Sequence, residues 1–203
     1  MSGQILILSG PSGSGKSTLL SRALKEIDGL VFSISSTTRA PRDGEIDGVH
    51  YHFVSEDEFK KGIEAGEFLE WANVHKNFYG TSLIQVKKAL GEGKIVVFDI
   101  DVQGFKLAKE KLAKIITSVF VTTVNKDELK RRLKFRATDS DNVIENRLLN
   151  AVGEMEHINE YDYLIINDDL QKSYESLKNI ISSMRLKASG VNVHELLQTW
   201  IGD

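Results

Sequence analysis

Residues 10–17 read Gly10-Pro11-Ser12-Gly13-Ser14-Gly15-Lys16-Ser17 and match the phosphate-loop pattern G-x-x-x-x-G-K-[ST]. An apolar run at residues 5–8 precedes the loop, and a helical stripe of apolar residues follows it. Glycines let the backbone turn tightly and point N–H groups inward, while the helix N-terminus adds partial positive charge. We therefore expect a phosphate site in which Lys16 reaches the phosphates and the Ser17 hydroxyl binds Mg²⁺. Because GTPases, ATPases and small-molecule kinases share this loop, it leaves the reaction open.

Outward from the loop, short apolar runs alternate with helical patterns along most of the chain. The expected strands are residues 5–8, 30–34, 51–54, 95–100, 116–122 and 164–166. The expected helices are residues 16–27, 83–90, 102–112, 126–136, 142–156 and 174–184, one starting near Glu56 and a short one after Asn192. This alternation predicts an α/β fold with a largely parallel sheet.

The composition limits the class of protein. The chain has 203 residues, a net charge of −3 and no cysteine, which excludes disulfides, thiol catalysis and cysteine-bound metals. The charge balance argues against a chain that coats nucleic acid or an anionic membrane. No apolar run approaches the length of a membrane span and the N-terminus lacks a basic signal region, so we expect a cytoplasmic protein.

Two acidic residues follow the apolar run at residues 95–98. Ligands bind beyond the carboxyl ends of strands in α/β sheets. Asp99 and Asp101 are therefore candidates for holding Mg²⁺ through a water molecule or for contacting a substrate. Asp101 also precedes a helical stretch and could act only as its N-cap. Strand alternation predicts that Asp99 points to the face opposite Phe98 and Ile100.

Arg39 and Arg42 flank Pro41 in a polar stretch rich in hydroxyl groups. Two arginines at this spacing form a plausible phosphate clamp, because each guanidinium can bind phosphate with two hydrogen bonds. The alternative is a solvated basic turn. A second anion site is the better interpretation beside a phosphate loop.

These segments together resemble guanylate kinases. The resemblance rests on GPSGSGKST at residues 10–18, SSTTRAPRDGEIDGVHYHF at 35–53, FLEW at 68–71, YGT at 79–81 and VFDIDVQG at 97–104. It runs from about residue 4 to residue 185. It implies Mg²⁺-dependent transfer of a phosphoryl group from ATP to GMP, without a covalent intermediate.

The resemblance also implies a domain organisation. The expected architecture is a three-layer P-loop NTPase core with a parallel sheet, an inserted GMP-binding subdomain and a helical lid. The core would comprise residues 1–34, 82–125 and 148–203, the subdomain residues 35–81, and the lid residues 126–147.

Site residues follow from the same resemblance. ATP would be bound by residues of the loop and helix start and by one asparagine, namely Gly10, Pro11, Ser12, Gly13, Ser14, Gly15, Lys16, Ser17, Thr18 and Asn167. GMP would be bound by Ser35, Arg39, Arg42, Tyr51, Glu70, Tyr79, Thr81 and Asp101. Mg²⁺ would be held by Ser17 and, through water, by Asp99. A carboxylate such as Glu70 can accept from the N1–H and N2–H₂ donors of guanine, which adenine lacks.

A basic segment at residues 130–136 completes the expected site. Phosphoryl transfer depends on neutralising charge on the moving group, and arginines that arrive on closure can supply it. The resemblance assigns Lys16, Arg132, Arg136 and Arg147 to catalysis. Phe135 stands where the family often has glycine, and we expect it to stiffen the hinge or pack against the core.

Three other functions are alternatives to a guanylate kinase. A phosphate-binding scaffold domain of similar build is disfavoured, because such domains typically lose the phosphate-loop residues and Gly15, Lys16 and Ser17 are present here. A kinase acting on another nucleotide is disfavoured by Glu70 with its neighbouring hydroxyls, and a GTPase lacks an Asn-Lys-x-Asp sequence here. The expected partners are ATP and GMP, with dGMP as a further acceptor and a homodimer as an open question, but no nucleic acid or membrane.

Overall fold

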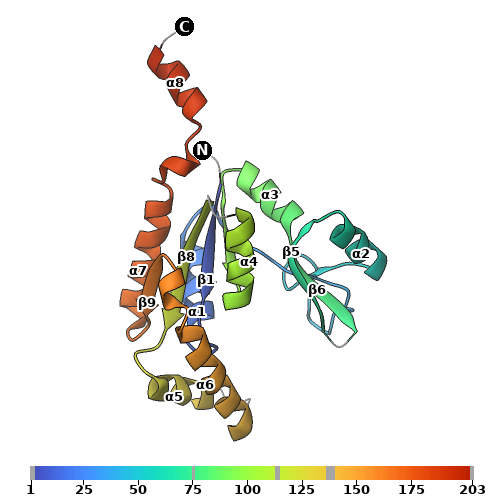
Figure 1. The fold of residues 1–203 in the computed structure, drawn as a ribbon, viewed down its shortest axis with the longest axis vertical. Helices are drawn as coiled ribbons and strands as arrows, with labels where there is room; N and C mark the ends of the chain where they lie inside the picture. The colour runs from blue at the N-terminus through green and yellow to red at the C-terminus, as the bar shows by residue number, and fades with distance from the viewer. Residues whose placement is uncertain (1–2, 75, 113–114, 136–139, 202–203) are drawn as a thin grey trace.

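The computed structural model describes residues 3–74, 76–112, 115–135 and 140–201. Within this part of the chain, five strands form a parallel sheet in the order β2-β7-β1-β8-β9 (Figure 1). These strands are β1 (Gln4–Ser9), β2 (Leu30–Phe32), β7 (Ile95–Asp99), β8 (Ile116–Thr122) and β9 (Tyr163–Ile166). Strand β1 is central and buried throughout, which explains its continuous apolar sequence.

Helices cover both faces of this sheet and make a three-layer α/β fold. On one face α1 (Lys16–Glu26) and α7 (Leu170–Met184) pack against Leu6 and Leu8 of β1. On the other face α4 (Val102–Leu112) and α3 (Leu83–Gly91) pack against Ile5 and Ile7. The alternate residues of β1 therefore belong to two different cores, as the period of a strand requires.

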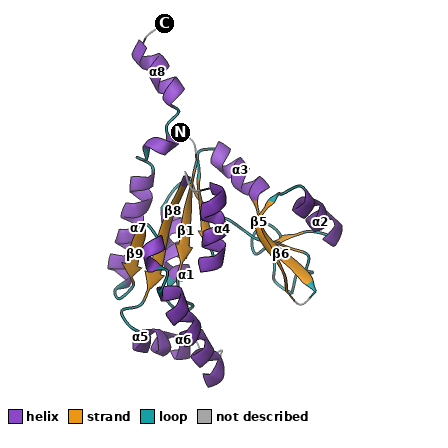
Figure 2. Cartoon of the chain, in the orientation of Figure 1, coloured by secondary structure: helices purple, strands orange, loops and turns teal. Residues whose placement is uncertain are grey.

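A second sheet lies to one side of the first (Figures 1 and 2). Its strands have the order β4-β3-β6-β5, and they are β3 (Ser36–Thr37), β4 (His52–Phe53), β5 (Phe68–Val74) and β6 (Asn77–Ser82). Helix α2 (Glu56–Glu64) covers it through Phe59, whose ring stacks on Phe68 at 4.2 Å and lies 5.4 Å from the ring of Phe78. These aromatic contacts hold α2 on the second sheet, while Leu69 of β5 packs into the core of the parallel sheet.

Two further helices pack on each other beyond the carboxyl ends of the parallel strands. They are α5 (Lys126–Phe135) and α6 (Asp141–Met155), and their shared core is Leu129, Leu133, Ile144, Leu148 and Ala151. Short 3₁₀ turns occupy Ile158–Glu160 and Ala188–Gly190, and α8 (Val193–Ile201) projects away from the rest of the chain in Figure 1. No helix in the described ranges is long and apolar enough to cross a membrane.

Most of the expected elements are confirmed, and the corrections concern weak strands. The strand expected at residues 30–34 ends at Phe32, and that expected at 51–54 covers only His52 and Phe53. Strands β3, β5 and β6 were not predicted. The expected capping box is present: the Ser55 hydroxyl accepts from the Glu58 N–H, and the Glu58 carboxylate accepts from the Ser55 N–H at 2.9 Å.

Candidate active site

The phosphate loop connects β1 to α1 at the carboxyl end of the parallel sheet. Gly10 and Gly15 have φ angles of +133° and +98°, which side chains other than glycine rarely adopt. Neighbouring atoms also exclude a side chain: a Cβ on Gly10 would lie 2.0 Å from the Val121 carbonyl oxygen, and one on Gly15 would lie 2.2 Å from Nδ2 of Asn167. The glycines of the motif are thus required by tertiary contacts as well as by the local turn.

Lys16 folds back over the loop that precedes it. Its Nζ donates to the carbonyl oxygen of Gly10 at 2.5 Å and to that of Pro11 at 3.3 Å. The same side chain lines a cavity of about 310 Å³ together with Ser12, Ser17 and residues that follow β7. A cation beside inward-turned backbone is the arrangement expected for binding phosphate.

Asp99 and Asp101 line this cavity together with Lys16. Phe98 and Ile100 pack into the core on the α3–α4 side of the sheet and Val97 into the core on the α1–α7 side, so the expected alternation continues through Asp99 to the end of β7. Loss of surrounding water raises the pKa of Asp99, although the side chain is accessible, and the Lys16 ammonium partly offsets this effect. A nearby cation therefore favours the charged form of Asp99.

Asp101 fulfils the capping role that the sequence left as an alternative. Its Oδ1 accepts from the Gly104 N–H at 2.8 Å, and its carbonyl oxygen accepts from the Phe105 N–H at 2.9 Å. The side chain remains exposed and reaches the cavity while it caps α4. Capping therefore holds the carboxylate at the cavity wall, and its role toward guanine stays a prediction.

Helix α6 brings two charged side chains to the same region. Nη1 of Arg147 donates to the Ser12 hydroxyl at 3.1 Å. Glu154 lies seven residues later, on the same face of the helix. Burial raises the pKa of Glu154, the Lys16 charge lowers it and the Asp101 charge raises it. Glu154 was not among the predicted site residues, although its seven-residue spacing from Arg147 was a usable signal.

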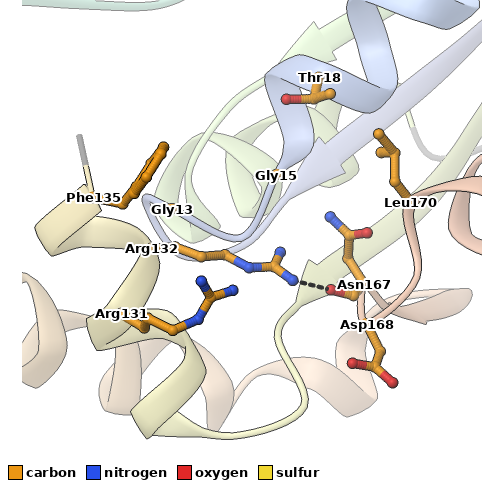
Figure 3. A pocket seen from close by; sticks show the side chains of 9 residues that line it. All are labelled: Gly13, Gly15, Thr18, Arg131, Arg132, Phe135, Asn167, Asp168 and Leu170. Carbon is orange, nitrogen blue, oxygen red and sulfur yellow. Dashed lines mark hydrogen bonds between the residues drawn. The ribbon is translucent and has the colours of Figure 1, made fainter.

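Arg132 and Asn167 lie on the outer side of the phosphate loop (Figure 3). The Arg132 guanidinium donates to Oε1 of Glu128 at 2.7 Å and to the Asn167 carbonyl oxygen at 2.8 Å. Nδ2 of Asn167 donates to the Ser14 carbonyl oxygen at 2.8 Å. These bonds join α5, the phosphate loop and the segment after β9. Glu128, which lies one helical turn before Arg132, was not among the predicted site residues.

Arg136 lies outside the described residues, so its expected catalytic role stays a prediction.

The residues of the phosphate loop differ in exposure. Thr18 lines the same cavity as Arg132 and Asn167, whereas Ser14 is buried. Pro11 is buried and Ser12 is exposed. The loop residues therefore present their backbone and only some of their side chains to the surface.

The expected arginine clamp, Arg39 and Arg42, is held by Glu45, an acid that was not among the predicted site residues. Nη2 of Arg39 donates to Oε1 of Glu45 at 2.8 Å, and the backbone N–H of Arg42 donates to Oε2 of Glu45 at 2.7 Å. These two bonds lower the pKa of Glu45 to about 2, the Arg39 bond being the larger cause. Glu45 therefore stays charged at neutral pH and orients Arg39.

Tyr51 and Tyr79 lie beside Arg39, as the resemblance requires. The Arg39 guanidinium carbon lies 5.5 Å from the centroid of the Tyr51 ring, and the two tyrosine rings meet edge to face at 5.9 Å. A hydrogen bond with Tyr79 contributes to raising the pKa of Arg39, after the larger contribution of Glu45. The Arg42 side chain is exposed at the edge of this group.

The proposed guanine-reading residues meet on neighbouring antiparallel strands. The hydroxyl of Thr81 on β6 donates to Oε1 of Glu70 on β5 at 2.7 Å. This bond leaves Oε2 of Glu70 as a further acceptor. Ser35 precedes β3, and its carbonyl oxygen accepts from the His52 N–H at 2.9 Å. The sheet thus brings together Glu70 and Thr81, which are 11 residues apart in the chain.

A parallel sheet with a phosphate loop after its central strand, flanked by an arginine site on a second sheet, defines a P-loop nucleotide kinase. The sequence profile of guanylate kinases matches residues 2–184. The chain is 57% identical over 201 residues to a guanylate kinase of Campylobacter jejuni (strain RM1221), covering 98% of each. It is 53% identical over 196 residues to that of Helicobacter pylori (strain 26695), covering 97% of this chain and 95% of the other.

A solved structure agrees with these sequence relatives. The crystal structure of guanylate kinase from Anaplasma phagocytophilum matches with a TM-score of 0.72 and 32% identity, covering 97% of this chain and 94% of that one. The chain therefore belongs to the guanylate kinase family of nucleoside monophosphate kinases. The reaction of this family is the ATP-dependent phosphorylation of GMP to GDP.

Proposed function

We propose that this chain performs the family's reaction with ATP bound at the phosphate loop and GMP bound on the second sheet. The observation that carries this assignment is the hydrogen-bonded pair of Thr81 and Glu70, on the sheet that also carries Tyr79, the neighbour of Arg39. One part of this sheet offers acceptors for a base and the other offers donors for a phosphate. That combination matches a purine nucleoside monophosphate.

The chemistry of the base favours guanine over adenine. Glu70 can accept from N1–H and N2–H₂ of guanine, and the Ser35 hydroxyl can donate or accept, while the Thr81 hydroxyl, which donates to Glu70, can still accept. Adenine has no donor at these positions, so its binding would leave the carboxylate unpaired. The role of Asp101 at the guanine belongs to the same proposal.

The donor phosphates are assigned to the cavity lined by Lys16. Lys16 and Arg147 supply positive charge there, and Arg132 and Arg136 complete the proposed catalytic set. The acceptor oxygen of GMP is already anionic, so the transfer needs no protein nucleophile and proceeds without a covalent intermediate. The protein contributes position and charge neutralisation.

The oxygen-bearing side chains of the same cavity fit Mg²⁺. The Ser17 hydroxyl and the Asp99 carboxylate both line it, and magnesium prefers oxygen ligands and retains several waters. Bound Mg²⁺ would supply charge neutralisation at the phosphates. Ser17 would hold the ion directly, and Asp99 would act through water.

The domain division also belongs to the proposal. The core would comprise residues 1–34, 82–125 and 148–203, with residues 35–81 as the GMP-binding subdomain and residues 126–147 as the lid. The α5–α6 pair has a core distinct from the two cores of the parallel sheet, and the rings of Phe59, Phe68 and Phe78 pack together in the 35–81 segment, which supports this division. Leu148 and Ala151 of the α5–α6 core lie beyond the proposed lid boundary. Cytoplasmic location, a homodimer and acceptance of dGMP stay predictions.

The direct test is a coupled assay of ADP release with ATP and Mg²⁺, comparing GMP, AMP, UMP and dTMP as acceptors. We expect ADP only with GMP among these four. Turnover with another acceptor would keep the phosphate loop and overturn the guanine assignment. A folded protein without turnover on any acceptor would instead indicate a phosphate-binding scaffold.

The contact between Glu45 and Arg39 gives a second expected result. Glu45→Gln removes the charge that orients Arg39, so we expect the KM for GMP to rise about three- to tenfold, equivalent to about 1 kcal/mol, with little change in kcat. Steady-state kinetics with saturating ATP would measure this. Glu92→Gln, which disrupts an exposed pair with Lys94, is the matched control. An unchanged KM for GMP would show that Arg39 is positioned without Glu45.

The ion pair of Glu45 with Arg39 determines in which direction stability changes with pH. The folded-state pKa of Glu45, about 2, lies below its ordinary value of 4.5. Its contribution to stability is therefore present above the ordinary pKa and is lost as the pH falls toward 2. Because Glu45 stays charged across neutral pH, its titration should cause no change of the KM for GMP with pH in that range.

A further inference from the structure

Phe135, the last residue of α5, is one of the most exposed large apolar side chains in the described part of the protein. Its exposed fraction is 87%, so the expectation that it packs against the core is wrong. Leu129 and Leu133 of the same helix are buried instead. Phe135 thus contributes nothing to the core of the α5–α6 pair, and its position calls for another explanation.

The Phe135 side chain lines a cavity of about 410 Å³ on the outer side of the phosphate loop. This volume lies within the range of roughly 300–1,000 Å³ that is usual for small-molecule sites. Figure 3 shows Phe135 at one side of the cavity and Leu170, the first residue of α7, at the other. The cavity therefore has apolar groups on both flanks.

A planar cation lies between these two flanks. The Arg132 guanidinium is held by Glu128 and by the carbonyl oxygen of Asn167, and these bonds restrict its orientation. A fixed guanidinium and an aromatic ring both favour flat aromatic ligands. The lining, which also includes the exposed Arg131 and Asp168, therefore offers flat surfaces on which a heterocyclic base can stack.

The two cavities around the phosphate loop are adjacent. Gly13 and Gly15 line both the cavity of Lys16 and the cavity of Phe135. A nucleotide whose phosphates occupy the first cavity must cross these glycines to extend into the second. The base of the donor nucleotide would then reach Phe135, which lies beyond the loop.

We propose that Phe135 is a specificity-determining residue that contacts the adenine ring of the donor nucleotide, in the cavity it shares with Arg132 and Leu170. The proposal rests on the proposed function, because it takes the phosphates of the donor to lie at Lys16. It adds an aromatic contact at a position where the sequence analysis expected only a hinge or packing role.

Binding of ADP and of inorganic pyrophosphate separates a contact with the base from an effect on the loop. We expect Phe135→Ala to weaken Mg-ADP binding about three- to tenfold in calorimetry, and to leave Mg-pyrophosphate binding unchanged. Phe135→Trp should retain ADP affinity, and its indole fluorescence should change with ADP but not with pyrophosphate in a Trp71→Phe, Trp200→Phe background. Leu186→Ala, at a residue 85% exposed and distant from this cavity, is the control.

Two results would overturn the proposal. Equal weakening of ADP and pyrophosphate would show that Phe135 acts on the phosphate loop, and unchanged ADP affinity would show that it does not touch the base. Neither result affects the proposed function, which fails only if the unmodified protein does not phosphorylate GMP. A wild-type enzyme active on GMP, with ADP binding insensitive to Phe135→Ala, would therefore reject this inference alone.

Discussion

Lys16→Ala is expected to lower kcat by about 10³-fold or more, because it removes a cation from the point where charge develops on the transferring phosphoryl group. The Lys16 ammonium now lies against the Gly10 and Pro11 carbonyl oxygens, within the cavity that Ser17 and Asp99 also line. A bound phosphate would offer it an anionic partner at the loop. Single-turnover and steady-state kinetics would measure the loss.

The fold should survive this change. Helix α1 is anchored by Leu19, Leu20 and Ala23, which are buried against the sheet, and the Lys16 side chain contributes nothing to that core. Thermal unfolding followed by circular dichroism would test this point. Lys25→Ala, at an exposed lysine in the last turn of the same helix, is the control and should retain activity. A folded Lys16→Ala protein with near-normal kcat would contradict the assignment of the phosphate loop.

Glu70→Gln is the second change with a large expected effect. The substituted amide keeps one acceptor oxygen but presents an NH₂ donor to the N1–H and N2–H₂ donors of guanine. The variant loses a charge-assisted hydrogen bond, and its NH₂ donor faces a donor of guanine. Together these two effects should lower kcat/KM for GMP by roughly 10²-fold. The measurement is kcat/KM at saturating ATP.

A comparison of GMP with IMP makes this test sharper. IMP lacks the N2 amino group, so the wild-type protein should prefer GMP, and Glu70→Gln should reduce that preference. Thr81→Val removes the hydroxyl that donates to Glu70 while keeping the shape of the side chain, and a smaller effect in the same direction is expected. Glu64→Gln on α2 is a control at an exposed carboxylate. If the ratio of kcat/KM for GMP to kcat/KM for IMP stays unchanged in Glu70→Gln, the assignment of Glu70 to guanine recognition is wrong.

The elements predicted well are those whose information is local. The central strand of the parallel sheet is apolar because both of its faces are buried, and the helices around it carry a regular apolar stripe. Ser55 and Glu58 form a capping box through bonds that span three residues. Such patterns need only neighbouring residues to be recognised.

The second sheet was largely missed for a physical reason. Strands β3 and β4 have two residues each, and β5 and β6 carry polar residues such as Asn73 and Asn77 beside their aromatic ones. Their order depends on Phe59 stacking on Phe68 and on pairing between β5 and β6, with a register shift between Phe68 and Trp71. Hydrophobic periodicity is too weak to show strands of this kind.

The sequence by itself determined the phosphate loop, the parallel sheet and the resemblance to guanylate kinases, because these depend on contiguous motifs and on regular burial. Only the tertiary structure decided how the charged side chains are paired. The contacts of Arg39 with Glu45 and of Thr81 with Glu70, the approach of Glu154 to Lys16, and the exposure of Phe135 depend on how separate segments lie in space. A side chain's partner is set by distance in the folded chain, and residue order does not encode that distance directly.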